Sequence, residues 1–561
     1  MTLRSVAARV ATPSSVLRRA WALPLAAHAA ALLVVLGVVL VAFMRPTSAY
    51  TSDEGAYALQ AIALQDGHWA YDHELAEYDD AEGTYFPLVN SDRGEEGWLA
   101  YARHPLWPTV LAASGSLFGN DLGLHLPSLL GAVGTACAAW CLAGALDRRA
   151  ARPAFWLLAT GPVLAHGFLL WAHAPFAAVS GFALVLALQV ARGRGGRFAV
   201  LGCGALLALG LLLRSEGVFL AAATGLVVAG EVGRRAGART GLFVLVGLGL
   251  PSAVALYVER AWVSSILGAS VAAPASPATS GSSSYLAGRA SGASSTLLAG
   301  SYGSGTTARV LALAAMVVPL LAVLALRRGG PRHDVLVGAG IAAGLLVARI
   351  VLAPGEPIGG LLPAWPLLVA GLAGAGAWLW RGPGRVLSRV SALVIVAVLL
   401  TQYPEGGGLE WGGRFLAALW VPLAALAAAG VAARWDGWHP GLRTVASRGA
   451  VTLGAASAIV CLVAVASLRA DHEEVVAGIE ATASPVAVST IPSVPRLAWR
   501  THGEVAWLLA EPHELDDLTA RLAAGGVAEV TIVAFEEPTG AGFSEVTPAG
   551  DAVWVLTEPR G

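Results

Sequence analysis

Long runs of apolar residues alternate with short polar loops along most of the chain. Many of these runs approach the length that an α-helix needs to cross a bilayer, about 20 residues. The pattern predicts about thirteen transmembrane helices, near 21–44, 122–145, 153–171, 174–191, 198–213, 217–230, 241–258, 309–326, 335–352, 361–380, 386–402, 414–433 and 450–468. The short pair at 198–213 and 217–230 could instead form one broken hairpin.

Clusters of arginine occupy every second loop between these runs. They are "DRRAAR", "ARGRGGR", "EVGRRAGAR", "LRRGGPRHD", "RGPGR" and "RWDGWHPGLRTVASR". By the positive-inside rule these loops and the N-terminal residues 1–20 are cytoplasmic, and the alternate loops face outward. The run 21–44 is longer than the apolar part of a secretory signal, so we expect an uncleaved signal anchor.

Four outward segments have distinct character. The region 45–121 forms a long first extracytoplasmic loop, called the first loop below, and 268–307 is a Ser/Gly-rich stretch expected to be flexible. A short turn follows at 402–414. The tail 469–561 contains strand-like "PVAVST", "AEVTIVAF" and "AVWVLTE" around an amphipathic helical stretch, "HELDDLTARLAAGG", which predicts a small α/β domain outside the membrane.

The expected fold is therefore mainly α: a polytopic membrane protein with a transmembrane domain over 21–468 and a small C-terminal α/β extracytoplasmic domain. Composition agrees, because 56% of the 561 residues are hydrophobic and only 13% are charged. The net charge of −1 gives no basic field for nucleic acid. The four cysteines lie inside apolar runs and are expected to be buried thiols. The absence of lysine, with abundant alanine and glycine, is typical of a high-GC bacterial genome.

The stretch "YTSDEGAYALQ" follows the first span and admits two interpretations. Thr51 and Glu54 have the spacing of a capping box, and Asp53 suits the first turn of a helix, where the macrodipole favours negative charge. Asp53 also emerges at the outer membrane surface, where a carboxylate could do chemistry. We expect the capping residues to be structural and Asp53 to be the reactive one.

Other polar residues stand at outer ends of predicted helices. "YARHPLWP" places Arg103 and His104 at the end of the first loop. "LRSEG" places Arg214 beside Glu216, which could form an ion pair that eases burial or a phosphate contact. "LEWGGR" contains Arg414 four residues after Glu410, so the two could pair on a helix, and Trp411 beside them could line a donor pocket.

These residues suit sugar transfer from a lipid phosphate. The leaving phosphate is already an anion, so one carboxylate suffices to deprotonate or orient the acceptor hydroxyl. Arginines stabilise the charge that grows on the departing phosphate. A glycosidase would instead need a second carboxylic acid to protonate its leaving group.

The motifs "SDEGAYALQAIALQDGHW", "ARHPLWP" and "GGGLEWGGRFLAALWVP" resemble those of the GT-C superfamily of polytopic glycosyltransferases, in its bacterial branch related to aminoarabinose and protein mannosyltransferases. The resemblance covers roughly 21–468. It implies a catalytic role for Asp53, with Glu54 as its neighbour, and a phosphate contact for Arg103. His104, Arg214 and Arg414 are further candidates for the donor phosphate, and Tyr57, Glu216 and Trp411 for the pocket.

Two positions depart from the pattern of that superfamily. Arg103-His104-Pro105 stands where Lys-Pro-Pro is usual, and His173 stands where many relatives have a second acidic residue. No metal ligand set is therefore assigned and no cofactor is certain, although a divalent cation remains an open alternative.

We expect a glycosyltransferase of the bacterial plasma (inner) membrane that transfers a sugar from a polyprenyl-phosphate donor to an extracytoplasmic acceptor, with the lipid bilayer as its solvent and no nucleic-acid partner. A flippase or transporter of lipid-linked glycans is the first alternative, although most charges lie at helix ends and no internal repeat is evident. A non-catalytic membrane scaffold for envelope assembly is the second.

Overall fold

The structure is a computed structural model. It describes residues 23–268 and 360–559 with gaps at 79–82, 89–91, 95–96, 377, 382, 402–411, 483 and 551, together with isolated positions between 289 and 340. Apart from those positions, the expected spans near 309–326 and 335–352 and the Ser/Gly-rich stretch lie outside the described residues. The N-terminal residues 1–20 and Trp411 lie outside them as well.

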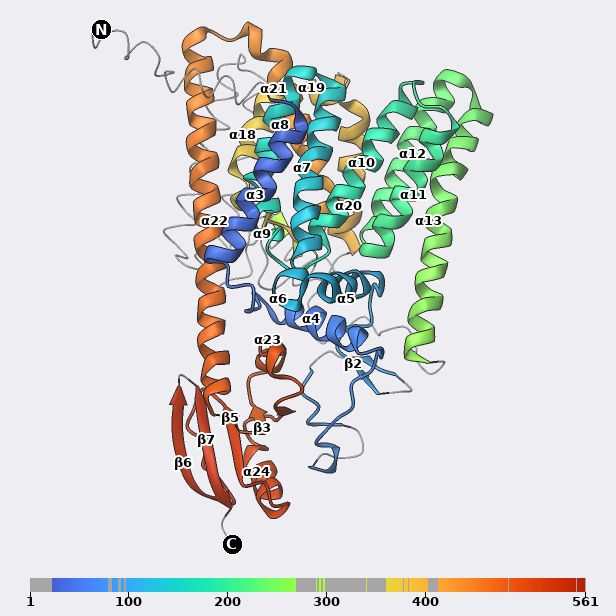
Figure 1. The fold of residues 1–561 in the computed structure, drawn as a ribbon. Helices are drawn as coiled ribbons and strands as arrows, with labels where there is room; N and C mark the ends of the chain where they lie inside the picture. The colour runs from blue at the N-terminus through green and yellow to red at the C-terminus, as the bar shows by residue number, and fades with distance from the viewer. Residues whose placement is uncertain are drawn as a thin grey trace, which may run out of the picture.

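Apolar helices stand side by side in a bundle (Figure 1). Within the described residues, seven are long and apolar enough to cross a membrane. They include α3 (Leu25–Phe43), α7 (Leu126–Leu146), α10 (His173–Ala191), α12 (Gly217–Ala236), α13 (Ala238–Leu267), α21 (Ala417–Arg434) and α22 (Pro440–Thr482). Shorter helices in the same bundle are α11 (Arg197–Leu213), α18 (Pro366–Ala375) and α20 (Arg385–Thr401). The chain is thus mainly helical, as expected.

Two expected spans are broken into shorter helices. The run 153–171 forms α8 (Ala151–Ala159) and α9 (Pro162–His166), because Pro162 cannot donate a helical hydrogen bond. The run 361–380 forms α17 (Leu361–Ala364), α18 and α19 (Trp378–Arg381). By contrast, α11 and α12 are separate helices joined by a turn at 214–216.

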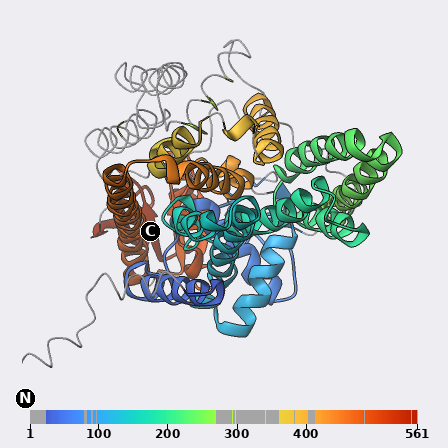
Figure 2. The ribbon, with the colours of Figure 1, turned by 90° about the horizontal axis from the view of Figure 1, so that it is seen from above.

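Small residues let the central helices approach closely. Helix α21 is the most enclosed of the long helices described, because 89% of its apolar 18-residue stretch is buried. A Cβ at Gly181 of α10 would lie 2.8 Å from Val421 of α21, and a Cβ at Gly430 would lie 2.1 Å from Ala375 of α18. Such contacts suit a membrane, where helices associate through close packing. Seen from above, α11, α12 and α13 form a group beside α10 (Figure 2).

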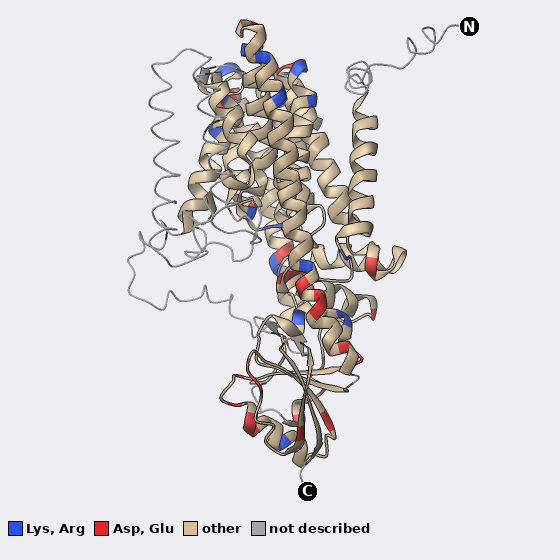
Figure 3. Cartoon of the chain, turned by 90° about the vertical axis from the view of Figure 1, so that its left-hand side faces the viewer, with Lys and Arg blue, Asp and Glu red and all other residues tan. Residues whose placement is uncertain are grey.

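The charged side chains lie mainly at the two ends of the bundle (Figure 3). At the end far from the C-terminus, Glu231 of α12 pairs with Arg234, Arg235 and Arg385. At the same end η2 (Arg148–Ala150) meets η4 (Trp435–Gly437) through Arg149 and Asp436. We call this the arginine-rich end, and the opposite one the domain end.

The first loop covers the domain end. Helices α4 (Ser52–Gln65), α5 (Leu106–Phe118) and α6 (Asn120–Gly123) lie there, across the direction of the bundle (Figure 1). Between α4 and α5, the chain forms η1 (Ala76–Tyr78) and a small antiparallel pair, β1 (Asp92–Arg93) and β2 (Trp98–Leu99).

The C-terminal region forms a five-stranded sheet in the order β4-β3-β5-β7-β6. Strand β3 is parallel to β4 and β5, whereas β7 is antiparallel to β5 and β6. The bounds are β3 (Val486–Ser489), α23 (Val494–Leu497), η5 (Trp499–Thr501), β4 (Ala506–Leu509), α24 (Leu515–Ala524), β5 (Glu529–Val533), β6 (Phe543–Gly550) and β7 (Val553–Pro559). Three of these strands coincide with the expected ones, and β4 and β6 are additions.

This C-terminal sheet is packed into the first loop. Leu75 and Tyr85 of the first loop are buried in the same apolar cluster as Leu518 and Val530. The backbone N–H of Leu509 in β4 donates to the carbonyl of Tyr85 at 2.8 Å. The backbone of α23 also packs tightly against α4. A Cβ added at Gly55 of α4 would lie only 1.7 Å from the carbonyl oxygen of Arg496, so the site has room for glycine alone.

Gly55→Ala therefore tests how α23 is held against α4. Alanine favours a helix over glycine by roughly 0.5–1 kcal/mol, but here its Cβ would overlap backbone, and overpacking costs about 1–3 kcal/mol. We expect a lower melting temperature and faster proteolysis near α23. Gly230→Ala in α12, where a Cβ would meet nothing within 4 Å, is the matched control. Equal melting of the two variants would contradict this packing.

Candidate active site

The start of α4 lies against the domain end of the bundle. Thr51 is the N-cap residue, but its side chain makes no capping hydrogen bond. The expected capping box is therefore wrong in detail. The Glu54 side chain does reach back, yet it accepts from the backbone N–H of Tyr50 rather than from that of Thr51.

Glu54 is fully buried in a polar cluster that joins four segments, namely α4, the end of α3, the α9–α10 turn and α22. Its carboxylate accepts from the backbone N–H of Leu170, which precedes α10, and pairs with Arg469 of α22 at 3.3 Å. Arg469 is buried as well and also donates to the carbonyls of Met44 and Phe168. These bonds fasten the end of α3 and the α9–α10 turn to α22.

Burial raises the pKa of the Glu54 carboxyl, while the charge of Arg469 and the two backbone N–H groups act in the opposite direction. Because neither side chain of the pair has any exposed surface, an acceptor molecule has no access to Glu54. The geometry gives Glu54 a structural task and leaves Asp53 as the accessible carboxylate.

Asp53 points away from that polar cluster, and its side chain is 51% exposed. It pairs with Arg414, 361 residues later in the chain, at 3.1 Å. Arg414 begins η3 (Arg414–Leu416), and its guanidinium lies over the ring of Trp171 at 4.9 Å. The pair brings together two residues that the sequence nominated separately.

A second set of polar groups lies beside this pair. Tyr57, one turn after Asp53, hydrogen-bonds Tyr101 at 3.2 Å. Burial raises the pKa of both phenols, and the charges of Arg214, Asp53 and Arg414 all act on Tyr57. The candidate carboxylate, two candidate arginines and the candidate tyrosine are therefore neighbours.

Arg214 is itself neutralised by Glu216. The two side chains meet through two hydrogen bonds, at 2.8 and 3.0 Å. Burial alone would lower the pKa of Arg214, but the attraction of Glu216 outweighs it and raises that pKa. Likewise burial would raise the pKa of Glu216, and Arg214 lowers it. The pair stays charged, and Glu216 offsets the positive charge that Arg214 would bring to a phosphate.

The remaining nominated residues are placed less directly. His104, in the left-handed region at φ 51°, pairs with Glu259 of α13. Arg103 is exposed and makes no ion pair within the described residues.

A cluster of histidine and tryptophan rings meets Arg414 through Trp171. His166, His173, Trp171 and Trp420 pack with ring centroids 4.7–5.4 Å apart. Both ring nitrogens of His173 are buried and have no hydrogen-bond partner in the described part of the chain. His173 thus occupies the wall behind Arg414, at the position where the sequence motif suggested an acid.

A cavity of about 230 Å³ opens in front of Asp53 and is called the Asp53 pocket here. It is lined by Thr51, Ser52, Asp53, Arg414, His472, Ser493 and Leu497. Sequence reasoning missed the last three, because α22 and the C-terminal region reach the pocket only through the tertiary fold. Arg469, the partner of Glu54, was missed as well, although an arginine at the outer end of the last expected span is a sequence signal of a buried ion pair or a binding site.

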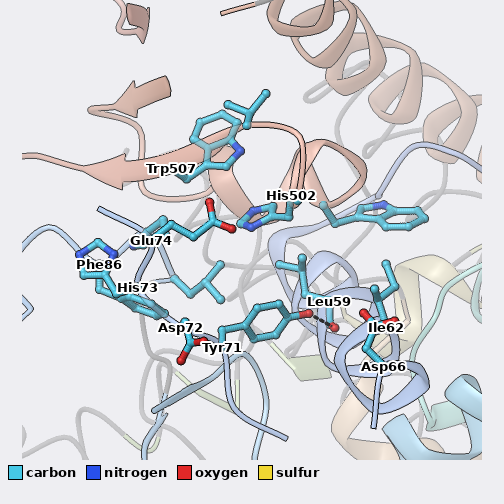
Figure 4. Close-up of a pocket in the computed structure, with 15 residues that line it drawn as sticks. Leu59, Ile62, Asp66, Tyr71, Asp72, His73, Glu74, Phe86, His502 and Trp507 are labelled. Atoms are coloured by element: carbon cyan, nitrogen blue, oxygen red, sulfur yellow. Dashed lines mark hydrogen bonds between the residues drawn. The ribbon is translucent and has the colours of Figure 1, made fainter. Parts of the chain in front are cut away.

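A second cavity, of about 160 Å³, lies between the first loop and the C-terminal sheet (Figure 4). Asp66, Asp72 and Glu74 contribute carboxylates, and Trp507 and His502 stand on the sheet side. Burial lowers the pKa of His502 to about 4, so this ring is neutral at physiological pH. The charged side chains lining this cavity are acidic, in contrast with the arginine beside Asp53.

No group of three or more His, Cys, Asp or Glu side chains within the described residues is arranged to hold a metal ion. Asp53 offers one carboxylate whose partner is an arginine. Divalent cations such as Mg²⁺ prefer several oxygen ligands, and among the described residues Asp53 supplies only one carboxylate.

No protein-family model matches the chain, and no curated protein matches its sequence. Solved structures do align. Cupriavidus metallidurans ArnT bound to undecaprenyl phosphate is 15% identical, with a TM-score of 0.43, over 94% of this chain and 97% of that one.

Two structures from Archaeoglobus fulgidus also align. Oligosaccharyltransferase AglB with an inhibitory peptide and a dolichol-phosphate is 14% identical, with a TM-score of 0.41, over 90% and 69% of the two chains. The oligosaccharyltransferase complex with Zn and sulfate is 14% identical, with a TM-score of 0.41, over 89% and 67%. At this similarity no residue role is transferred from them.

Arg469→Met tests the structural task of Glu54. Removing one partner of a buried ion pair typically costs about 3–5 kcal/mol, because the other charge is left without compensation. We expect a large fall in melting temperature and in the yield of folded protein in detergent. Arg448→Met, an exposed arginine on the same helix α22, is the control and should melt like the wild type. A stable Arg469→Met variant would show that the pair is dispensable.

Proposed function

We propose that this protein is a membrane glycosyltransferase that moves a sugar from a polyprenyl-phosphate donor to an extracytoplasmic acceptor. The observation that carries the proposal is the ion pair of an exposed carboxylate, Asp53, with Arg414 at a pocket on the domain end of an apolar bundle. A base and a phosphate-binding cation are thereby held within one hydrogen bond of each other.

In the proposed reaction the donor phosphate binds Arg414 and draws it from Asp53. A guanidinium binds a phosphate through two parallel hydrogen bonds, and it stabilises the charge that grows as the sugar–phosphate bond breaks. Trp171 supports this arginine from behind. Arg214 adds positive potential near Tyr57, but its charge is shared with Glu216.

Asp53 then acts on the acceptor. Its carboxylate takes the proton of the acceptor hydroxyl while the oxygen attacks the anomeric carbon, and polyprenyl phosphate leaves as an anion. Only one acid–base residue is needed. Glu54 takes no part in this step and instead fixes the turn of helix from which Asp53 projects.

The proposed orientation places the domain end outside the bacterial plasma membrane. The arginine clusters gather at the opposite end of the bundle, as the positive-inside rule requires of a cytoplasmic face (Figure 3). The Asp53 pocket then faces the extracytoplasmic leaflet, where a flipped lipid donor and an envelope acceptor could meet. Arg103 and His104 remain proposed secondary contacts of the donor phosphate.

Asp53→Asn is the central test. Purified protein in proteoliposomes is supplied with labelled polyprenyl-phosphate sugars and extracted envelope lipids and glycans, and transfer of label is measured. We expect the substitution to reduce transfer by roughly 10²–10⁴-fold, the usual contribution of a general base. Asp121→Asn is the matched control, since Asp121 also lies exposed in the first turn of a helix, α6, at the domain end.

Transfer that survives in Asp53→Asn would remove Asp53 from the proposed role. Movement of the labelled lipid across the bilayer without transfer, in wild type and variant alike, would favour the flippase instead.

A further inference from the structure

The C-terminal region supplies an arginine to the neighbourhood of Asp53. Arg496 lies in α23, whose neighbours Ser493 and Leu497 line the Asp53 pocket. The carbonyl of Arg496 rests against Gly55, two residues after Asp53, so its backbone is held at the first turn of α4. A segment 443 positions distant in the chain is thus brought next to the candidate base.

The guanidinium of Arg496 is unusual for its burial. The residue is 7% exposed, and its Nε has no hydrogen-bond partner in the described part of the chain. It makes no ion pair there either. Burial lowers the pKa of Arg496, and the charge of Asp53 opposes that shift. A buried arginine normally has its donors satisfied, so the unpartnered Nε of Arg496 leaves a donor for an anion that arrives or turns during the reaction.

Several charged and titratable groups lie near Asp53 and bear on its charge. Arg414 of η3 hydrogen-bonds it, Arg214 lies beyond Tyr57 and Tyr101, and Glu216 neutralises Arg214. His472 of α22 lines the pocket and bonds the carbonyl of Ala49, while Glu54 faces away toward Arg469. Within the described residues, Arg414 thus contacts the Asp53 carboxylate directly, and Arg496 lies close enough for the two charges to interact.

We propose that Arg496 is a positioning residue, which takes over the Asp53 carboxylate when Arg414 turns to the donor phosphate. This rests on the proposed function for the identity of the donor. Without a second cation, Asp53 would lose its hydrogen-bond partner at the moment it must be ionised and aimed at the acceptor. With Arg496 the carboxylate stays charged and oriented, because an adjacent cation favours the ionised form. The C-terminal region is in this way part of the catalytic site.

The test compares Arg496→Gln, Arg496→Lys and Arg500→Gln in the full-length protein. Arg500 lies four residues further on, in η5, and is exposed, so it controls for loss of one positive charge on the same segment. Asp53 is labelled with a water-soluble carbodiimide, which attacks the protonated carboxyl, and the labelled site is located by mass spectrometry. Each variant is labelled with and without added undecaprenyl phosphate as the probe.

We expect labelling of Asp53 to rise in Arg496→Gln only when undecaprenyl phosphate is present, because Arg414 holds the carboxylate in its absence. Arg496→Lys, which keeps the charge, and Arg500→Gln should behave as the wild type. Equal labelling of Arg496→Gln with and without the lipid, or no rise at all, would overturn the inference. If Arg496→Gln melts early, Arg496→Met, which also removes the charge, takes its place in the same comparison, with the same two outcomes.

The transfer assay gives a second readout. Arg496→Gln should lower kcat by roughly 10–100-fold, the range expected for a displaced catalytic group, with the KM for the lipid donor unchanged. A rise in that KM alone would mean that Arg496 binds the donor directly. Absence of transfer by the wild type would remove the proposed reaction, while the lipid-dependent labelling would still report on Arg496.

Discussion

The buried pair of Glu54 with Arg469 is the interaction on which the arrangement of the site depends. Two charges are removed from water at the point where α3, α4, the α9–α10 turn and α22 converge. Burying them is tolerable only because backbone N–H groups and carbonyls complete their hydrogen bonding. The pair therefore sets which way α4 faces, and with it the exposed side on which Asp53 stands.

The same convergence explains why two adjacent carboxylates have opposite fates. Successive helical residues point about 100° apart. Because Glu54 is buried in the polar cluster, Asp53 must face away from it. Asp53 meets Arg414 there, at the edge of a pocket whose far wall is the C-terminal region. A burial requirement thus positions a reactive group that takes no part in the buried pair.

Periodicity predicted much of the architecture. The apolar runs marked α3, α7, α10, α21 and α22, and alternation marked three strands of the C-terminal sheet, because each of these patterns is local. The prolines at the breaks Gly161-Pro162 and Trp365-Pro366 are visible in the sequence as well, but they lie within runs apolar enough to read as continuous spans. The nominated residues Asp53 and Arg414 prove to be neighbours.

What local pattern could not supply was pairing across the chain. Asp53 with Arg414, Glu54 with Arg469 and Gly55 with Arg496 each join segments more than 300 residues apart. A sequence shows that Arg469 sits oddly at the end of an apolar run, without showing what it neutralises. The capping box failed for the same reason: the Glu54 carboxylate accepts from the distant Arg469 and the distant backbone N–H of Leu170, and locally from Tyr50 rather than from Thr51.

Helix α22 has a mechanical consequence. Its 43 residues span about 65 Å, roughly twice the thickness of a hydrocarbon core, in a single uninterrupted helix that ends at the C-terminal sheet. Because the helix is continuous, it sets the distance between the apolar bundle and the C-terminal sheet.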